Sequence, residues 1–528
     1  MTDTDTPTML AEVNNLAGRS LGGDELASWT QFAKRFLDRF LITEWADRNV
    51  DDVFGAVNSS WQMLQQYSAA EPDVRLFNPS MQEHGWCSPH TVLQVHQTDM
   101  PFLVASIRCE LNRRNIAIHT IKSVPLQVHR DSAHKLKQLS FSSSMNGDSK
   151  QDDEREGEAP REALIYMEIS RHTDPQLLQD LVLAVQDVLK DVATAVADYQ
   201  PLLSATEELE SSLSRVSQLP LSQMVEESQA FLRWLRDDHF TFLGYTEYDL
   251  VTRDGVQELH ENPGKRLGLF RLESSPGDAK VLGAHKPGLA QFYLSPKLIA
   301  FSKAAVRSRV HRRAYPDYVV VKRFNEQGDV CGEARILGLY TSDVYTLSPQ
   351  SIPLIRDKIQ QTFVRTGLDK RSHEGKTLRR ILETFPRDEL FQCGSAELYE
   401  IVTAVAAIND RYQVRLFIRP DSFGKFVNCL VYVPRDLFST NIRRRIQTLL
   451  EEALHAEEAD FNTYLSESIL ARVHMVFRVD PASTLDYDAQ QLEQEIVELT
   501  RSWDNRLRAA LTQEHGEERA GQLLEDYG

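Results

Sequence analysis

The stretch VRLFIRPDSFGKFVNCLVYVPRD, residues 414–436, decides the fold of the second half of the chain. Val414, Leu416 and Ile418 alternate with Arg415 and Arg419, which is typical of a half-buried strand. Residues 421–425 contain Asp, Ser and Gly and predict a turn. Phe426–Val433 is nearly all apolar and ends at Pro434, so it predicts a second, buried strand running back along the first.

The residues on either side of this hairpin predict a complete small sandwich. Upstream, Glu389–Cys393 is predicted as a strand and Ala396–Ile408 as a helix. Downstream, Ser439 or Thr440 can cap a helix that turns Ile442, Ile446, Leu449, Leu450 and Leu454 inward. Alternating apolar residues at 473–479 predict the last strand, with Arg472, His474 and Arg478 facing outward. The predicted order is therefore β-α-β-β-α-β, which is typical of a ferredoxin-like sandwich.

The same pattern occurs earlier in the chain. Strands are predicted at 91–96, 115–125 and 163–170, with helices at 102–112 and 178–196. The polar segment 140–162 interrupts them and is interpreted as a solvated loop inserted between two strands. We therefore predict an α+β protein with two ferredoxin-like sandwiches, a β-rich module between them and helical connectors.

Changes in pattern give the domain boundaries. A helix with Trp29, Phe32, Phe36 and Phe40 on one face precedes the first sandwich, and we expect this stripe to be core. The β-rich module has predicted strands at 241–248, 268–272, 298–303, 318–324 and 330–340, with a hairpin turn at 325–329. We predict a mobile tail at 1–27, helical lead-in and first sandwich at 28–200, helical connector at 201–237, β-rich module at 238–350, helical linker at 351–382, second sandwich at 383–482, and C-terminal helical segment at 483–528.

Composition excludes several classes of protein. The 528 residues contain 59 Lys and Arg against 77 Asp and Glu, a net charge of −18, which argues against a general nucleic-acid binder. The five cysteines are far apart and form no CxxC pair, which indicates reduced thiols. The sequence shows no signal peptide and no apolar run of about 18 residues. We therefore expect a cytoplasmic protein without a membrane or nucleic-acid partner.

The sequence carries none of the common catalytic and metal-binding motifs. The sequence contains no G-x-G-x-x-G, G-x-x-x-x-G-K-[ST], H-E-x-x-H or G-x-S-x-G. Ser372-His373-Glu374 places three catalytic residue types side by side, but adjacent side chains point apart, so a loop or helix-capping role is favoured. We predict no catalytic residue, no metal ligand and no cofactor bound by this chain.

One basic stretch departs from the overall acidity. Residues 302–324 contain Lys303, Lys322, Arg323 and, at their centre, Arg307, Arg309, Arg312 and Arg313. Guanidinium groups bind carboxylate or phosphate in a bidentate manner, so one interpretation is an anion pocket. The other is an interface that pairs with acidic neighbours in this chain or in another subunit, and we favour it because structural ion pairs are commoner than ligand sites.

Four ordered stretches resemble the N-terminal part of the large bacterial NAD-dependent glutamate dehydrogenases. They are SRVHRRAYPDY (308–318), ILETFPRDEL (381–390), VRLFIRPD (414–421) and CLVYVPRD (429–436). The resemblance covers residues from about 28 to 528. It implies that both sandwiches are ACT-type regulatory domains, which commonly bind amino acids or form subunit interfaces. It also implies a catalytic domain for NAD and glutamate much further along, so we expect this chain to end before it.

The resemblance implies a role in regulation and assembly. In the full-length family member, L-glutamate is oxidatively deaminated to 2-oxoglutarate and ammonia with NAD, and this segment would act through a small amino-acid effector or homo-oligomer contacts. Alternatives are a stand-alone ACT-type amino-acid sensor and an enzyme with an unusual active site.

The resemblance also points to candidate effector-binding residues. Asp99 and Pro101 lie at the strand-to-helix turn where ACT modules often hold a ligand, although for Asp99 ordinary helix capping is the favoured interpretation. Arg419 and Asp421 lie at a strand end of the second sandwich and could instead pair with each other.

Overall fold

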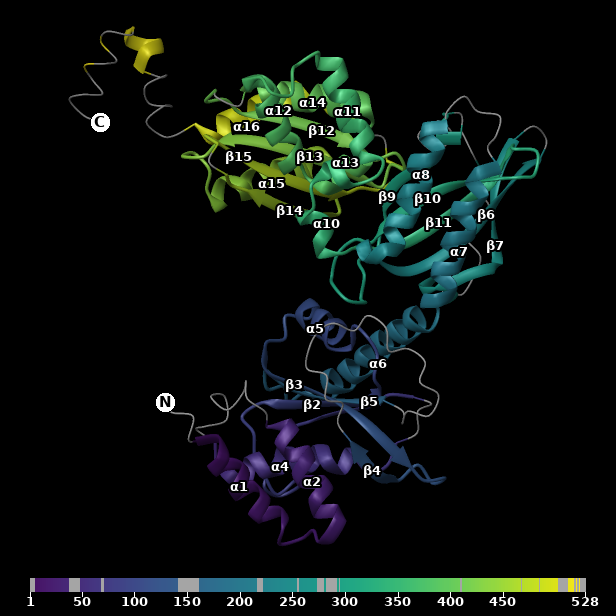
Figure 1. Ribbon diagram of the computed structural model, residues 1–528. Coiled ribbons are helices and arrows are strands. Elements are labelled where there is room, and N and C mark those ends of the chain that lie inside the picture. The colour runs from purple at the N-terminus through teal and green to yellow at the C-terminus, as the bar shows by residue number, and fades with distance from the viewer. Residues whose placement is uncertain are drawn as a thin grey trace. The chain divides into compact units, whose positions relative to one another are not determined.

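A computed structural model places the chain in two compact units (Figure 1). One unit comprises residues 1–198 and 308–314, and the other comprises residues 199–307 and 315–528. The structure describes residues 5–37, 48–67, 71–140, 161–215, 222–253, 256–272, 280–281, 292–293, 295–408, 411–466, 468–483, 485–501, 511–516, 519 and 522. Phe40, most of the predicted loop 140–162 and part of the 483–528 segment lie outside them.

The first unit contains one five-stranded antiparallel sheet in the order β1-β2-β5-β3-β4. Its elements are β1 (Asp73–Phe77), β2 (Thr91–Thr98), α5 (Leu103–Arg113), β3 (Ile118–Arg130), β4 (Leu136–Ser140), β5 (Arg161–Ile169) and α6 (Pro175–Ala197). The predicted order of strand, helix, strand, strand and helix is confirmed for β2, α5, β3, β5 and α6. The edge strand β1 and the β3–β4 hairpin were not predicted.

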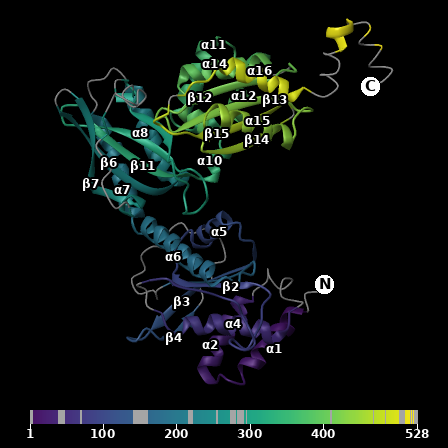
Figure 2. The same ribbon diagram turned by 180° about the vertical axis from the view of Figure 1, so that it is seen from behind.

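Helices cover both faces of this sheet (Figures 1 and 2). α5 and α6 lie on one face, and α1 (Asp5–Ala17), α2 (Gly23–Phe36) and α4 (Val50–Leu64) lie on the other. The aromatic stripe is confirmed as core, because Trp29, Phe32 and Phe36 are fully buried and Phe36 packs edge-on against Tyr166 of β5 at 5.3 Å. Aromatic side chains of this size contribute much of the apolar area that holds a helix on a sheet.

The second unit begins with α7 (Tyr199–Ser212) and α8 (Ser222–Trp234) and a six-stranded antiparallel sheet. Its strands are β6 (Phe240–Arg253), β7 (Val256–Gly268), β8 (Lys280–Val281), β9 (Ile299–Lys303), β10 (Asp317–Phe324) and β11 (Val330–Tyr340), in the order β8-β7-β6-β11-β10-β9. The hairpin at 325–329 is confirmed, since β10 pairs with β11 and the Asn325 side chain accepts from two backbone N–H groups of the turn.

One strand prediction in this sheet is wrong. Residues 268–272 were predicted as a strand, but β7 ends at Gly268 and Leu269–Leu272 form a 3₁₀ turn. Gly268 has φ +60°, and a Cβ at this position would lie 2.3 Å from the Leu243 carbonyl oxygen. A left-handed backbone in such close contact ends the strand and requires glycine.

A helical segment and a four-stranded antiparallel sheet complete the second unit. The segment comprises α10 (Ser342–Thr346), α11 (Ile355–Thr366), α12 (His373–Thr384), α13 (Arg387–Gln392) and α14 (Ser395–Ile408). The sheet, in the order β12-β13-β15-β14, contains β12 (Arg415–Pro420), β13 (Phe426–Pro434), α15 (Thr440–Ala453), β14 (Glu458–Tyr464), β15 (Leu470–Arg478) and, after it, α16 (Ala489–Thr500). The capping roles of Ser372 and Ser439 are confirmed, because each accepts from a first-turn N–H.

The prediction of a strand at Glu389–Cys393 is wrong. Residues 389–392 lie in helix α13, and Cys393 is the residue at which the helix ends. The module therefore starts with two adjacent strands, β12 and β13, and its order is strand, strand, helix, strand, strand, helix. The first unit shows the same order in β1, β2, α5, β3, β5 and α6, with β4 added. In both sheets the first strand lies at an edge beside the second, and the fourth lies between the second and third.

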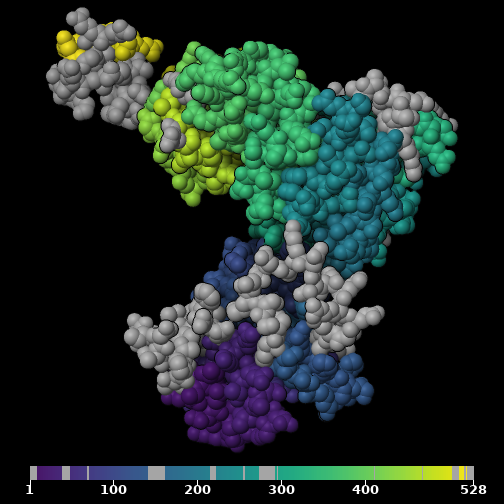
Figure 3. All heavy atoms as spheres, viewed as in Figure 1, coloured from purple at the N-terminus to yellow at the C-terminus, as the bar shows by residue number. Residues whose placement is uncertain are grey.

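Helices also cover both faces of the four-stranded sheet. Val427, Val431 and Met475 pack with α15 and α16, whereas Leu430, Tyr432 and Leu470 pack with the helical segment. Successive side chains of a strand point to opposite faces, so alternate residues of β13 and β15 enter two different cores. In the space-filling view the green residues of the helical segment lie against the yellow-green residues that follow it in the chain (Figure 3).

Candidate functional site

Helix α13 lies between the two sheets of the second unit and bonds to both. It starts after Pro386, and its first turn carries Asp388 and Glu389, which suits the positive end of a helix dipole. Asp388 pairs with Lys303 of β9, whose Nζ lies 2.9 Å from Asp388 Oδ2 and 2.9 Å from Asp317 Oδ1. The helix is thereby fixed to the six-stranded sheet through a buried lysine.

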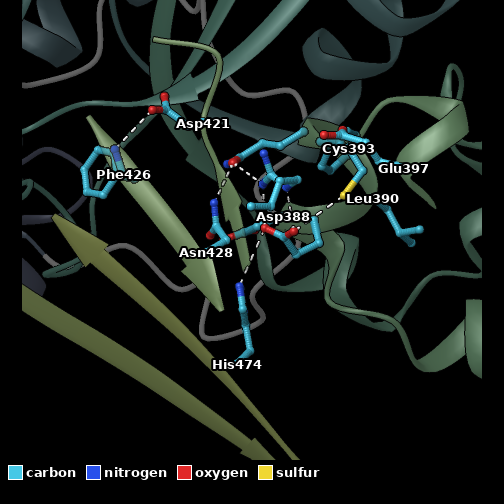
Figure 4. Close-up of polar contacts among 12 residues, drawn as sticks. Asp388, Leu390, Cys393, Glu397, Asp421, Phe426, Asn428 and His474 are labelled. Atoms are coloured by element: carbon cyan, nitrogen blue, oxygen red, sulfur yellow. Dashed lines mark hydrogen bonds and ion pairs between the residues drawn. The ribbon is translucent and has the colours of Figure 1, made fainter. Parts of the chain in front are cut away.

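Glu389 binds the four-stranded sheet. Its two carboxylate oxygens accept from Arg419 Nη2 at 2.7 Å and Arg419 Nε at 2.9 Å, and both side chains are buried. Asn428 and His474 point into the same group from β13 and β15 (Figure 4). The His474 ring nitrogen Nε2 lies 3.7 Å from Glu389 Oε1, and Gln392 accepts from Arg419 Nη2 at 2.9 Å. A bidentate arginine–carboxylate pair thus joins α13 to β12.

Neighbouring cations determine the protonation state of Glu389 and Asp388. Burial opposes the negative charge of Glu389, but Arg419 outweighs it and holds the pKa of Glu389 well below its ordinary value. Burial likewise opposes the charge of Asp388, and Lys303 lowers the pKa of that carboxyl. Both carboxylates are therefore charged in the folded protein near neutral pH.

Lys358 of α11 closes the carboxyl end of α13. Its Nζ donates to the carbonyl oxygens of Leu390 (2.8 Å), Phe391 (2.7 Å) and Cys393 (2.9 Å). These carbonyls have no partner within the helix, so a cation at this end stabilises it. Burial lowers the pKa of Lys358 to about 8.

The two predicted residues Arg419 and Asp421 have different roles in the structure. They do not pair with each other, because Arg419 binds Glu389. Asp421 Oδ2 accepts from Ser302 at 2.7 Å, while Oδ1 accepts from the backbone N–H groups of Lys425 (2.7 Å) and Phe426 (3.1 Å). Asp421 therefore holds the β12–β13 turn.

Asp99 and Pro101 lie before α5 in the first unit. The helix predicted at 102–112 begins at Leu103, because Phe102 adopts a left-handed conformation with φ 73°. No side chain caps this helix, so Asp99 is not its cap. Burial raises the pKa of the Asp99 carboxyl.

The basic stretch is divided between the two units. Arg307 belongs to the second unit and donates to Glu458 (2.7 Å) and Asp460 (2.6 Å). Arg309, Arg312 and Arg313 belong to the first unit, where Arg309 Nη1 lies 3.6 Å from Asp191 Oδ2 and Arg313 is exposed. The four arginines therefore do not meet in one pocket within either unit.

Acid is expected to destabilise the second unit. The pKa of Glu389 is lower in the folded than in the unfolded chain, so its contribution is complete above the unfolded value of about 4.3 and is lost as the pH falls below it. Urea unfolding at a series of pH values should show this decline. Glu389→Gln should reduce its slope, whereas Glu400→Gln, at an exposed helix position, should not. An unchanged slope in Glu389→Gln would contradict the assignment.

Two other kinds of site are absent from the described residues. In the part of the chain that the structure describes, no helix is long and apolar enough to cross a bilayer. Within the same residues, no three His, Cys, Asp or Glu side chains are grouped so that they could hold a metal ion.

Three segments match protein-family models. Residues 32–184 match the glutamate dehydrogenase ACT1 domain, residues 352–411 match glutamate dehydrogenase helical motif 1, and residues 415–504 match the glutamate dehydrogenase ACT2 domain. The chain is 40% identical over 529 residues to the NAD-specific glutamate dehydrogenase of Halomonas elongata, and 38% identical over 518 residues to that of Pseudomonas aeruginosa. Each alignment covers 98% of this chain.

The chain belongs to the NAD-specific glutamate dehydrogenase family. The resemblance seen in the sequence is thereby confirmed. A Mycobacterium tuberculosis NAD-specific glutamate dehydrogenase is more distant, at 26% identity over 79% of this chain and 25% of its own length. The chain spans about a third of the length of the two nearer relatives, 32% and 31%.

Within this family, α13 belongs to helical motif 1 and Arg419 belongs to the ACT2 domain, so the Glu389–Arg419 pair joins the two matched segments. The family name implies NAD. All strand pairs of the described sheets are antiparallel, whereas dinucleotide folds present a parallel sheet and a G-x-G-x-x-G turn. The residues described here do not fit an NAD site.

Sequence reasoning missed the importance of Glu389 and Lys358. The signal for α13 was present in Pro386-Arg-Asp-Glu, a proline followed by acidic residues, which is typical of a helix start. No pattern along the chain indicates that Arg419 pairs with a residue 30 positions earlier.

Proposed function

We propose that this chain is the regulatory and assembly portion of a glutamate dehydrogenase that converts L-glutamate, NAD and water to 2-oxoglutarate, ammonia and NADH. The observation that carries the proposal is the succession of ACT1, helical motif 1 and ACT2 matches along the chain. Catalysis is assigned to another part of the full-length enzyme, which acts in the cytoplasm. The shared strand order of the two smaller sheets supports ferredoxin-like, ACT-type modules with a permuted first strand.

The contacts of α13 suggest how this portion acts. A short helix that is fixed to one sheet by Asp388 and to the other by Glu389 transmits a displacement of either sheet to its neighbour. In this proposal Arg419 and Asp421 are positioning residues. Asp99 and Pro101 stay candidates for an amino-acid effector, because no side chain caps the nearby N-terminus of α5.

The experiment uses the purified 528-residue chain. We expect no NADH from L-glutamate and NAD, and an oligomer in size-exclusion chromatography with light scattering. NADH formation would establish the rival in which this chain is itself an enzyme, and a monomer would contradict the assembly role.

A stand-alone amino-acid sensor is the alternative. Isothermal titration with the common amino acids, followed by activity assays of the full-length enzyme with the same compounds, separates the two. An amino acid that binds this chain and alters the full-length activity supports regulation. Binding without any effect on that activity favours the sensor.

A further inference from the structure

A second polar region lies on the same face of the four-stranded sheet as Arg419. It is a pocket of about 260 Å³ between the helical segment and strands β13, β14 and β15. Two arginines and several hydroxyl groups share its wall with apolar side chains. The lining residues are Arg380, Ile381, Thr384, Val405, Tyr432, Tyr464, Ser466, Ser468, Leu470 and Arg472.

The charge of Arg472 is not balanced in the way that the charge of Arg419 is. Arg472 Nη1 donates to the Thr384 carbonyl oxygen at 2.7 Å, and the guanidinium lies over the Tyr464 ring at 4.7 Å from its centroid. Its Nε is buried and has no hydrogen-bond partner. Among the described residues, no carboxylate forms an ion pair with Arg472.

A neighbouring guanidinium increases the local positive charge. Within the described part of the chain, Arg387 donates to the carbonyl oxygens of Glu383 (2.9 Å), Phe385 (3.2 Å) and Leu347 (2.9 Å) and to no carboxylate. Burial, and next the charge of Arg472, lower the pKa of Arg387. Arg380 adds a third cation at the exposed edge of the pocket. Buried charges are normally paired, so this cluster has the composition of an anion site.

We propose that this pocket binds a small metabolite through a carboxylate or phosphate group. Arg472 and Arg380 hold the anionic group, since guanidinium forks bind both kinds of anion by charge-assisted hydrogen bonds. The hydroxyl groups of Tyr432, Ser466 and Ser468 offer further donors. Ile381, Val405 and Leu470 contact a short apolar part of the ligand.

The volume of the pocket limits the size of the ligand, and its position indicates which contacts the ligand would affect. Its volume is below the range of about 300–1,000 Å³ for drug-sized ligands, which favours a small anion over a nucleotide. Its wall contains residues of α12 and α14 as well as strands of the ACT2 match, so the ligand contacts both sides of the junction that Glu389 closes. A regulatory meaning rests on the proposed function, but binding itself is a property of this chain.

The test measures anion binding by the 528-residue chain. Inorganic phosphate and succinate are titrated by calorimetry at constant ionic strength, with sodium chloride as the reference, and thermal unfolding is followed in each salt. We expect saturable binding of at least one probe and a rise in Tm that chloride does not give. Binding of phosphate alone identifies a phosphate ligand, and binding of succinate alone identifies a carboxylate.

Variants locate the site. Arg380→Gln, at an exposed helix position that folding tolerates, should weaken binding about tenfold, the effect of losing one charged hydrogen bond. Arg472→Gln should abolish it while the chain stays folded. Lys376→Gln is the matched control, because Lys376 is exposed one turn earlier on α12 and does not line the pocket. Absence of binding by both probes, or an equal loss in Lys376→Gln, would overturn the proposal.

Discussion

Glu389→Gln is expected to lower the free energy of unfolding of the second unit by about 3–5 kcal/mol. The substitution keeps the shape of the side chain but removes the negative charge that Arg419 contacts through two hydrogen bonds. Arg419 would then be a buried guanidinium without a counterion, and Asn428 would lose an acceptor. Most of the cost comes from this unpaired charge, since an intact buried pair contributes little net stability.

Two comparisons separate this cause from a general loss of charge. Glu400→Gln removes an exposed carboxylate from α14 and should change stability by no more than about 0.5 kcal/mol. Glu389→Leu combined with Arg419→Met removes both charges and should recover most of the loss. Urea unfolding with hydrogen exchange on β13 and β15 measures each variant. A double variant as unstable as Glu389→Gln would show that the loss does not come from the unpaired guanidinium.

The central strands were predictable because their burial requires many apolar residues, which the sequence shows. Phe426–Pro434 and Leu470–Arg478 pair with two neighbours each, and their apolar residues are continuous or alternate. The edge strands β1 and β14 were missed. Glu458–Tyr464 is half-buried or exposed throughout, so its sequence carries no alternation of apolar residues. An edge strand that buries little leaves little periodicity to find.

Helix α13 shows why residues 389–393 were misread as a strand. Six residues are less than two turns, and Leu390-Phe391 within them fits a buried strand as well as a helix. The helix is stabilised from outside by Lys358, which donates to its terminal carbonyls, and by Lys303 and Arg419, which bind its acidic side chains. These partners lie far away in the sequence, so local propensity could not decide.

The sequence indicated one residue of the candidate site by its type, but not the residues with which it pairs. Arg419 was correctly singled out, but its partner depends on the fold, because Glu389 lies on a helix that the sequence assigned to a strand. Arg472 belongs to an alternating strand and was predicted to point outward; the helical segment covers that face and encloses it in a pocket. Which side chains pair with each other depends on the tertiary structure. The periodicity of the sequence gives no information about it.

The first unit contains a network of the same composition as the Glu389–Arg419 group. Glu162 of β5 accepts from Arg130 at 2.7 and 2.6 Å and lies 2.7 Å from the His96 ring nitrogen Nε2. The face that carries His96 is covered by α4, a helix that precedes the sheet in the chain, just as α13 precedes β12. Both modules thus close their second sheet face with preceding helices around a buried carboxylate, arginine and histidine.

Phe391→Ala is expected to destabilise the second unit by about 3–5 kcal/mol, the usual cost of truncating a buried phenylalanine. The ring is 2% exposed and stacks on Tyr340 of β11 with centroids 4.5 Å apart. It also contacts Phe301 of β9 at 5.4 Å and Phe231 of α8 at 5.9 Å. Glu389, two residues earlier on the same short helix, faces the other sheet. The cavity would therefore loosen α13 and weaken the contacts that it makes with both sheets.

Hydrogen exchange distinguishes this shared core from a local defect. Protection should fall in β9 and β11 of the six-stranded sheet and in β12 and β13 of the four-stranded sheet together, with one lowered Tm for the unit. Phe461→Ala is the matched control, because Phe461 is 50% exposed and Arg443 lies over its ring, 3.7 Å from the centroid. That control should cost about 1 kcal/mol or less. A loss of protection limited to one sheet in Phe391→Ala would mean that α13 does not couple them, and the proposed transmission through this helix would fail with it.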